Sequence, residues 1–219
     1  MAPIPRDRFA FFEPHPYLSV GAPYGNASPW MLRQGVLKAL DNAASQLALE
    51  RPGWKIKLFD AYRPNAVQAF MVDRAFASQA QVAGLDPAHL TASEREDLHK
   101  KVFRLWGIPS DDPATPPPHS TGGAVDCTLT DEKENEVNMG SPIDENSERS
   151  FPDFFATSSD ASSRQAHANR VFLNDLMRAQ GFQRVTTEWW HFSLGDQLWA
   201  WREREERRVI DIVARYGRV

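Results

Sequence analysis

Apolar residues recur at helical spacing in several stretches of the chain. Val36, Leu40 and Leu47 lie on one face of a helix that we predict to open at Ser28-Pro29 and to run to about residue 50. Similar spacing, together with glycine stops and the Thr91-x-x-Glu94 capping box, predicts further helices. Their predicted ranges are 65–82, 92–105, 160–180 and 202–216.

Shorter stretches carry the pattern of strands. Residues 54–58 alternate between apolar and polar, which is typical of a strand with one buried face. Short apolar runs predict further strands over 124–129, 182–185 and 188–194, with a turn at 131–135 and an antiparallel return at 136–139. The segments rich in proline, glycine or polar residues are expected to be irregular, and they cover 1–28, 108–118 and 140–158.

This mixture of helices and short strands predicts an α+β fold in a single domain, with a small central antiparallel sheet flanked by helices. No internal repeat or long linker divides the chain, so residues 1–219 are expected to form one unit. Within it, 1–28 is an irregular N-terminal segment and 202–219 is a C-terminal helical extension.

Composition narrows the class of protein. With 42% hydrophobic residues, 7 Trp and 13 Phe, the 219-residue chain has ample material for a packed core. The net charge of -4 and the absence of a long basic run count against a nucleic-acid partner. A single cysteine, Cys127, excludes an internal disulfide and fits a reducing compartment. No segment has the apolar length of a membrane span or a signal sequence, so we expect a soluble, cytoplasmic protein.

Two stretches carry candidate chemistry, His119-Ser-Thr-Gly-Gly-Ala-Val-Asp126 and Glu188-Trp-Trp-His191. Two histidines and an aspartate make a three-ligand set of the kind that leaves a catalytic zinc one open position, and Glu188 remains free to move protons. Strand parity alone separates the members of each stretch onto opposite faces. A bend at the two glycines would bring His119 back beside Asp126, and a bulge, a strand end or a turn would do the same for Glu188.

Each of these residues also has a purely structural interpretation. A carboxylate between Val125 and Cys127 is costly unless it is paired or bound to a metal. Asp60 and Arg63 flank a predicted strand end and are suited to pair with each other, and Glu188 is compatible with a solvated position. Spacing therefore leaves both a metal site and a structural arrangement open.

Three motifs in order give the chain a family resemblance. Phe-Asp60-Ala-Tyr-Arg63-Pro, His119-x-x-Gly-x-Ala-x-Asp126 and Glu188-Trp-Trp-His191 resemble the zinc D-alanyl-D-alanine dipeptidases of the VanX type. The resemblance covers roughly residues 30–195, and it extends to Met139-Gly-Ser-Pro-Ile-Asp144. One departure is Pro117, which stands where the family usually has a serine that contributes to substrate binding.

The resemblance implies a set of roles. It implies one zinc ion per chain, held by His119, Asp126 and His191, with Glu188 as the catalytic base for attack by a zinc-activated water. It implies that Arg63 stabilises the developing oxyanion and that Asp144 helps to hold the free amino group of a small dipeptide substrate. Tyr62, Trp189 and the loop 108–118 are further expected to wall a small closed pocket.

Two alternatives remain at this level. One is a D,D-carboxypeptidase or endopeptidase that acts on longer cell-wall peptides with the same zinc site. The other is a zinc-stabilised binding domain without catalysis. Glu188 and Arg63 count against the second alternative, because a structural zinc needs neither residue and tends to have four protein ligands.

Overall fold

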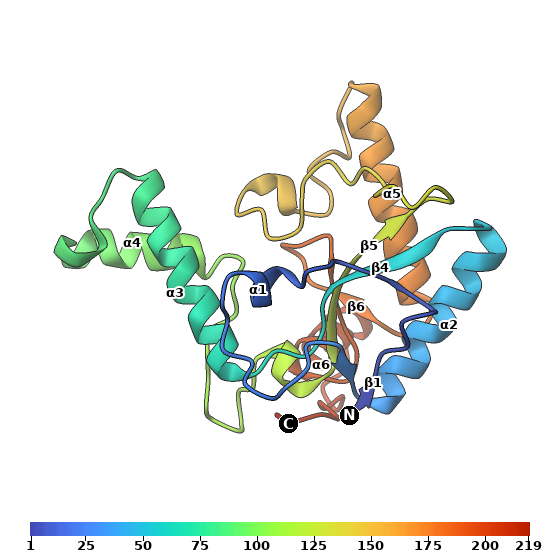
Figure 1. Ribbon diagram of the computed structural model, residues 1–219, viewed down its shortest axis with the longest axis horizontal. Helices are drawn as coiled ribbons and strands as arrows, with labels where there is room; N and C mark the ends of the chain where they lie inside the picture. Colours follow the sequence, from blue (N-terminus) through green and yellow to red (C-terminus); the bar gives the residue numbers. More distant parts are fainter.

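The computed structural model describes residues 1–219, and its centre is a five-stranded sheet in the order β2-β4-β5-β7-β6 (Figure 1). The neighbouring strands are antiparallel except β2, which pairs parallel with β4 at one edge. The strands are β2 (Ala10–Phe11), β4 (Lys55–Asp60), β5 (Ala124–Thr130), β6 (Gln183–Arg184) and β7 (His191–Ser193). Two more, β1 (Ala2–Pro3) and β3 (Met31–Leu32), form a separate antiparallel pair.

Helices surround this sheet, as the sequence predicted for a mixed fold in one domain. They are α1 (Pro16–Ser19), α2 (Gln34–Glu50), α3 (Asn65–Val82), α4 (Ala92–Val102), α5 (Ala161–Arg178) and α6 (Gln197–Arg207). Short 3-10 turns cover Pro87–His89, Pro118–Thr121 and Glu148–Ser150. In Figure 1, α2 and α5 lie together on one side of the sheet, while α3 and α4 project from the other side as an arm.

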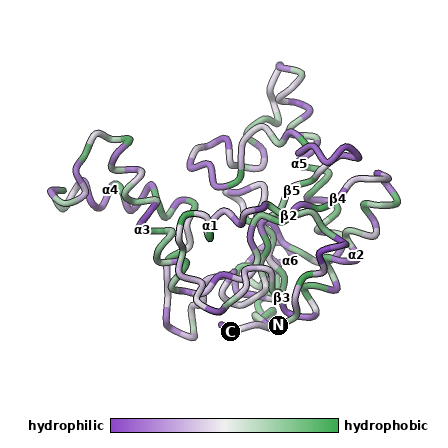
Figure 2. The backbone as a smooth tube through the Cα atoms, in the orientation of Figure 1, coloured by the Kyte–Doolittle hydropathy of each residue, from purple (hydrophilic) through white to green (hydrophobic).

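The alternation of side chains along β5 separates a core face from a site face. Val125, Cys127 and Leu129 are buried in the main hydrophobic cluster, together with residues of α2 and α5. Asp126 points to the opposite face, where the sheet is not covered by these two helices. Figure 2 shows hydrophobic segments where the strands meet α2, and hydrophilic segments along much of the α4 arm.

A bulge near the end of β4 places Asp60 on the same face as Asp126. The register pairs Leu58 with Cys127 and Asp60 with Asp126, so two residues of β4 advance against one residue of β5. In a regular strand Asp60 would share the core face of Leu58. The extra residue turns Asp60 towards the site, where its carboxylate is completely buried.

The start of α2 differs from the sequence prediction. The helix begins at Gln34 rather than at Ser28-Pro29, and its N-cap residue, Arg33, makes no side-chain capping bond. Residues 31–32 instead form β3 and pair with the N-terminal strand β1. This pairing, together with the bond from the Ile4 amide to the Trp30 carbonyl at 3.0 Å, holds the segment extended against its local helix signal.

The predicted C-terminal helical extension is wrong in its extent. α6 starts earlier, at Gln197, with Asp196 as its N-cap, and it ends at Arg207. Arg208 is in the left-handed conformation, and the chain then turns back across the body. The amides of Arg215 and Tyr216 both donate to the Gly195 carbonyl, at 2.7 and 3.0 Å, so tertiary contacts hold residues 208–219 in a non-helical path.

Other helices and strands are shorter than predicted. α4 ends at Val102, although its capping box is present as expected, and the strands predicted over 182–185 and 188–194 shrink to β6 and β7. Residues 136–139 make only an isolated bridge, between Glu136 and Thr130. The N-terminal segment is more ordered than expected, because it supplies β1, β2 and α1. Every helix is too short or too polar to cross a lipid bilayer.

Candidate metal centre

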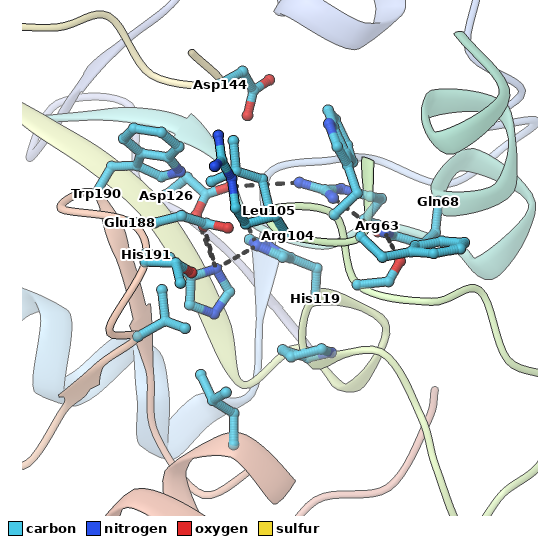
Figure 3. A pocket seen from close by; sticks show the side chains of 17 residues that line it. Arg63, Gln68, Arg104, Leu105, His119, Asp126, Asp144, Glu188, Trp190 and His191 are labelled. Carbon is cyan, nitrogen blue, oxygen red and sulfur yellow. Dashed lines mark hydrogen bonds and ion pairs between the residues drawn. The ribbon is translucent and has the colours of Figure 1, made fainter. Parts of the chain in front are cut away.

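The sheet brings three side chains with metal-binding atoms to one point. Asp126 of β5 lies directly opposite His191 of β7, so the two side chains share a face. His119 comes from the 3-10 turn that precedes β5, and Gly122, with a φ of 70°, ends this turn in the left-handed conformation. The ligand atoms of these three buried residues lie within 4.8 Å of one another (Figure 3).

Hydrogen bonds on the outer side of each imidazole fix which nitrogen faces the centre. His119 Nδ1 lies 2.7 Å from the Ala61 carbonyl oxygen, to which it donates, and its Nε2 therefore faces the site. His191 has the reverse arrangement, with Nε2 3.1 Å from the Ser193 hydroxyl and Nδ1 facing inward. The two inward nitrogens lie 3.2 Å apart.

The donor set of this centre fits a divalent metal. Asp126 Oδ2 lies 3.2 Å from His119 Nε2, and Oδ1 lies 3.1 Å from His191 Nδ1. Oδ1 is buried and has no hydrogen-bond partner, which is costly for an ionised oxygen unless a cation binds there. Burial disfavours the charge, but the two imidazoles outweigh it and hold the pKa of Asp126 well below its usual range. Two nitrogens and one carboxylate, with solvent access from a cavity, are typical of an open catalytic site.

Glu188 lies beside this centre and belongs to an irregular segment just before β7. It therefore reaches the site from a turn rather than along a straight strand, which resolves the parity problem of Glu188 and His191. Its Oε2 lies 3.9 Å from His191 Nδ1, and the residue is 9% exposed. Burial, followed by repulsion from Asp126 and Asp144, raises the pKa of this carboxyl well above its ordinary value.

Arg63 is held beside the centre by a dense set of bonds. Its Nε donates to Asp60 at 2.9 Å and its Nη1 donates to Gln68 at 2.8 Å. Its Nη2 donates to the Tyr17 hydroxyl at 3.1 Å and to Asp126 Oδ2 at 3.4 Å. These four bonds engage four of the five N–H donors of a guanidinium and leave one hydrogen of Nη1 free.

Asp60 holds the Arg63 side chain in place. Besides Arg63, its carboxylate contacts His15 Nε2 and the Tyr24 hydroxyl, both at 3.1 Å. Burial opposes its ionisation, but the Arg63 guanidinium and the His15 hydrogen bond hold the pKa of Asp60 below the ordinary value. The pairing of Asp60 with Arg63, which the sequence allowed as a structural feature, thus exists and also orients Arg63 towards the candidate metal ligand Asp126.

Asp144 reaches the same cavity from the long loop after β5. It has a φ of 65°, and its Oδ2 accepts a hydrogen bond from the Tyr17 hydroxyl at 2.9 Å. Burial and the nearby Asp126 raise the pKa of Asp144 to about 7. Tyr17, which comes from a stretch without any periodic signal, therefore links Asp144 to Arg63.

The cavity that contains these groups has a volume of about 250 Å³, and Figure 3 shows the side chains around it. It brings together six of the eight residues singled out in the sequence: His119, Asp126, His191, Glu188, Arg63 and Asp144. Of the loop 108–118, only Pro118 lines it. Lining residues that sequence reasoning missed include Gln68, Arg104, Trp106 and Trp190.

Tyr62 and Trp189 are not among the residues that line this cavity. Trp189 is 1% exposed, its indole nitrogen donates to the Ser141 hydroxyl at 3.0 Å, and both residues line a different cavity. Its neighbour Trp190 lines the cavity in its place. Strand parity counted from His191 would have selected Trp189, because residues two apart share a face; the irregular segment before β7 breaks this alternation and brings Trp190 to the cavity.

Comparison with known proteins places the chain in a family. The family model described as D-ala-D-ala dipeptidase, within the M15 peptidases, matches residues 11–210. This match spans most of the chain, so the protein belongs to this family of peptidases.

Named relatives agree with this assignment. The chain is 46% identical to a D-alanyl-D-alanine dipeptidase of Synechocystis sp., over 100% of this chain and 91% of the relative. It is 33% identical to a D-alanyl-D-alanine dipeptidase of Enterococcus faecium, over 76% of this chain and 72% of the relative. A solved structure of the LdcB LD-carboxypeptidase is similar over 83% of this chain and 66% of that chain, with a TM-score of 0.42 and 15% identity.

Proposed function

We propose that this protein is a zinc-dependent dipeptidase that hydrolyses D-alanyl-D-alanine. The observation that carries the proposal is the single small cavity in which three metal-binding side chains, a buried glutamate and an arginine face one another. The names of the relatives support the choice of substrate.

We assign the metal site to His119, Asp126 and His191. Zinc suits a set of two imidazoles and one carboxylate with an open position. When bound, zinc supplies Lewis acidity that activates water and polarises the peptide carbonyl. The Ala61 carbonyl and the Ser193 hydroxyl keep both imidazoles oriented for this task.

Glu188 moves the proton in this scheme. As water adds to the peptide carbonyl carbon, Glu188 accepts one proton from it and then delivers that proton to the nitrogen of the leaving amine as the C–N bond breaks. The raised pKa of Glu188 suits the second half of this cycle, because the carboxyl holds its proton until the amine takes it. With a divalent cation bound nearby, Glu188 would be held in the ionised form that the first half requires.

Arg63 and Asp144 handle the charges of the substrate. The free hydrogen on Arg63 Nη1 is available to the oxyanion that develops on the carbonyl oxygen, and its other bonds keep the guanidinium fixed before the reaction starts. Asp144 offers a carboxylate for the substrate ammonium group. The cavity is smaller than the roughly 300–1,000 Å³ of pockets that hold drug-sized ligands, which favours a dipeptide over a longer peptide.

The test combines metal analysis with kinetics on purified protein. The wild type loaded with zinc should hydrolyse D-alanyl-D-alanine, and chelation should abolish the activity. Glu188→Gln should still bind one zinc per chain while kcat falls by about 10²–10⁴-fold, because general acid–base catalysis is lost. Glu96→Gln, which removes an exposed carboxylate on α4, is the matched control and should behave as the wild type.

The substrate panel decides between the dipeptidase and its alternative. Peptides that end in D-alanyl-D-alanine but carry further residues at the amino end should be cleaved poorly, because they lack the ammonium group at the position of Asp144. Efficient cleavage of such peptides would replace the dipeptidase with a carboxypeptidase. Full activity of Glu188→Gln would remove Glu188 from its proposed role.

A further inference from the structure

The proposed roles leave one charged group of a dipeptide substrate, its carboxylate, without a partner in the protein. A dipeptide carries an ammonium group and a carboxylate, and the two are only a few bonds from the reacting carbonyl. The charged residues that line the cavity, apart from the imidazoles, are three acids and two arginines: Asp126, Asp144, Glu188, Arg63 and Arg104. The acids repel the substrate carboxylate, and the zinc is already assigned to the water and the peptide carbonyl, so the charge-matched partner among the lining residues is an arginine.

Arg63 is poorly suited to hold the carboxylate. Four of its five N–H donors are engaged by protein acceptors, and the remaining one is needed at the oxyanion. A bidentate contact with a carboxylate requires two parallel N–H donors. Asp60 and Asp126 also offset its positive charge, at 2.8 and 3.4 Å.

Arg104, unlike Arg63, has no protein acceptor for its N–H donors. It lies in the segment between α4 and the loop 108–118, it lines the cavity, and its side chain makes no hydrogen bond or ion pair with the protein. Its guanidinium carbon lies 5.9 Å from the Phe151 ring, a contact that leaves the N–H donors free. In the view of Figure 3, Arg104 lies between the side of the cavity with Glu188 and the side with Arg63.

The backbone that carries Arg104 is fixed even though its side chain is free. The amides of Leu105 and Trp106 both donate to the Val102 carbonyl, at 3.2 and 3.0 Å. Gln68, which also accepts from Arg63, donates through Nε2 to the Gly107 carbonyl at 2.7 Å. The segment with Arg104 is thereby tied to the same residue that positions Arg63.

From this charge inventory we propose that Arg104 binds the carboxylate of the dipeptide and so selects substrates with a free carboxyl end. This inference rests on the proposed dipeptidase function and adds a specificity-determining residue to it. A guanidinium with unengaged donors matches a planar carboxylate and forms charge-assisted hydrogen bonds. Because the contact exists in both the bound substrate and the transition state, it should act on KM rather than on kcat.

The experiment measures two substrates with the wild type and with one variant, Arg104→Gln. D-alanyl-D-alanine and its C-terminal amide differ only in the carboxylate that Arg104 is proposed to bind. Arg104→Gln should raise KM for the free acid by about 10–100-fold, as expected for the loss of a hydrogen bond to a charged group, with kcat within about twofold. For the amide, measured as a substrate or as a competitive inhibitor, Arg104→Gln and the wild type should give the same constant.

Two further variants serve as controls. Arg104→Lys keeps the charge but loses the fork of donors, so it should recover part of the affinity for the free acid. Arg74→Gln removes an exposed arginine of α3 that lines a neighbouring cavity instead, and it should leave both substrates unaffected. Thermal unfolding of Arg104→Gln should nearly match the wild type, because no hydrogen bond or ion pair with the protein is lost and the contact with the Phe151 ring is a long one at 5.9 Å.

The outcomes separate this inference from the proposed function. Equal effects of Arg104→Gln on the free acid and the amide, no effect on either, or a fall in kcat alone would overturn the role of Arg104 and leave the dipeptidase activity standing. A wild-type enzyme that does not turn over D-alanyl-D-alanine would overturn the proposed function and this inference with it.

Discussion

Replacement of Asp144 by asparagine should make the metal-free protein more stable and the enzyme worse at binding substrate. The pKa of Asp144 is raised to about 7 from an ordinary 3.8. Between these two values the folded protein keeps a proton that the unfolded chain has lost, so stability falls as the pH rises from about 4 to about 7. At about 1.4 kcal/mol per pKa unit, the full cost at pH 8 is about 4 kcal/mol at most.

Asparagine avoids this cost and keeps the contact with Tyr17. Its carbonyl oxygen accepts the same hydrogen bond from the Tyr17 hydroxyl that Asp144 accepts at 2.9 Å. Because Asp144 is only partly buried, we expect a gain of about 2 kcal/mol at pH 8 and of less than about 1 kcal/mol at pH 5. Urea denaturation of the metal-free wild type and variant at both pH values measures the difference. Asp73→Asn, which changes an exposed aspartate on α3, is the control.

The same substitution should raise KM for D-alanyl-D-alanine by about 10–100-fold, because the ammonium group loses a charge-assisted hydrogen bond. In the wild type, KM should fall as the pH rises and Asp144 ionises, with a midpoint at or below about 7 because the metal and the ammonium group both favour the charged form. In Asp144→Asn, KM should be independent of pH over this range. A stability gain that is equal at pH 5 and pH 8, or a KM equal to that of the wild type, would refute the reasoning.

Two other substitutions test the arginine network and the C-terminal segment. Arg63→Lys should lower kcat by about 10²–10³-fold, because lysine has three donors for four protein acceptors and none left for the oxyanion; steady-state kinetics that match the wild type would contradict this. Gly195→Ala should destabilise the protein by about 1–3 kcal/mol in urea denaturation, because its Cβ would lie 2.7 Å from the Tyr216 ring. Gly21→Ala has a similar positive φ but open space around it, and an equal loss there would assign the effect to backbone strain alone.

Local sequence patterns predicted those features of the fold that short-range physics controls. The periodicity and caps predicted helices close to the observed α3, α4 and α5, and the alternating run at 54–58 predicted most of β4. The boundaries failed where distant segments compete with local signals. Residues 31–32 pair with the N-terminal strand instead of extending α2, and residues 208–219 bind Gly195 instead of extending α6.

For the site, the sequence by itself determined the residue types and their order: two histidines, an aspartate and a separate glutamate in motifs that resemble one family. It could not determine which side chains meet, because parity along a single strand placed the members of each motif apart. Only the tertiary structure decided this, through the β4 bulge that turns Asp60 inward, the turn that delivers Glu188 and the direct pairing of Asp126 with His191. It also placed Trp190 rather than Trp189 at the cavity, and brought Tyr17 and Arg104 from distant segments to the same site. The physical reason is that these contacts depend on register and on long-range packing, which no local run of residues encodes.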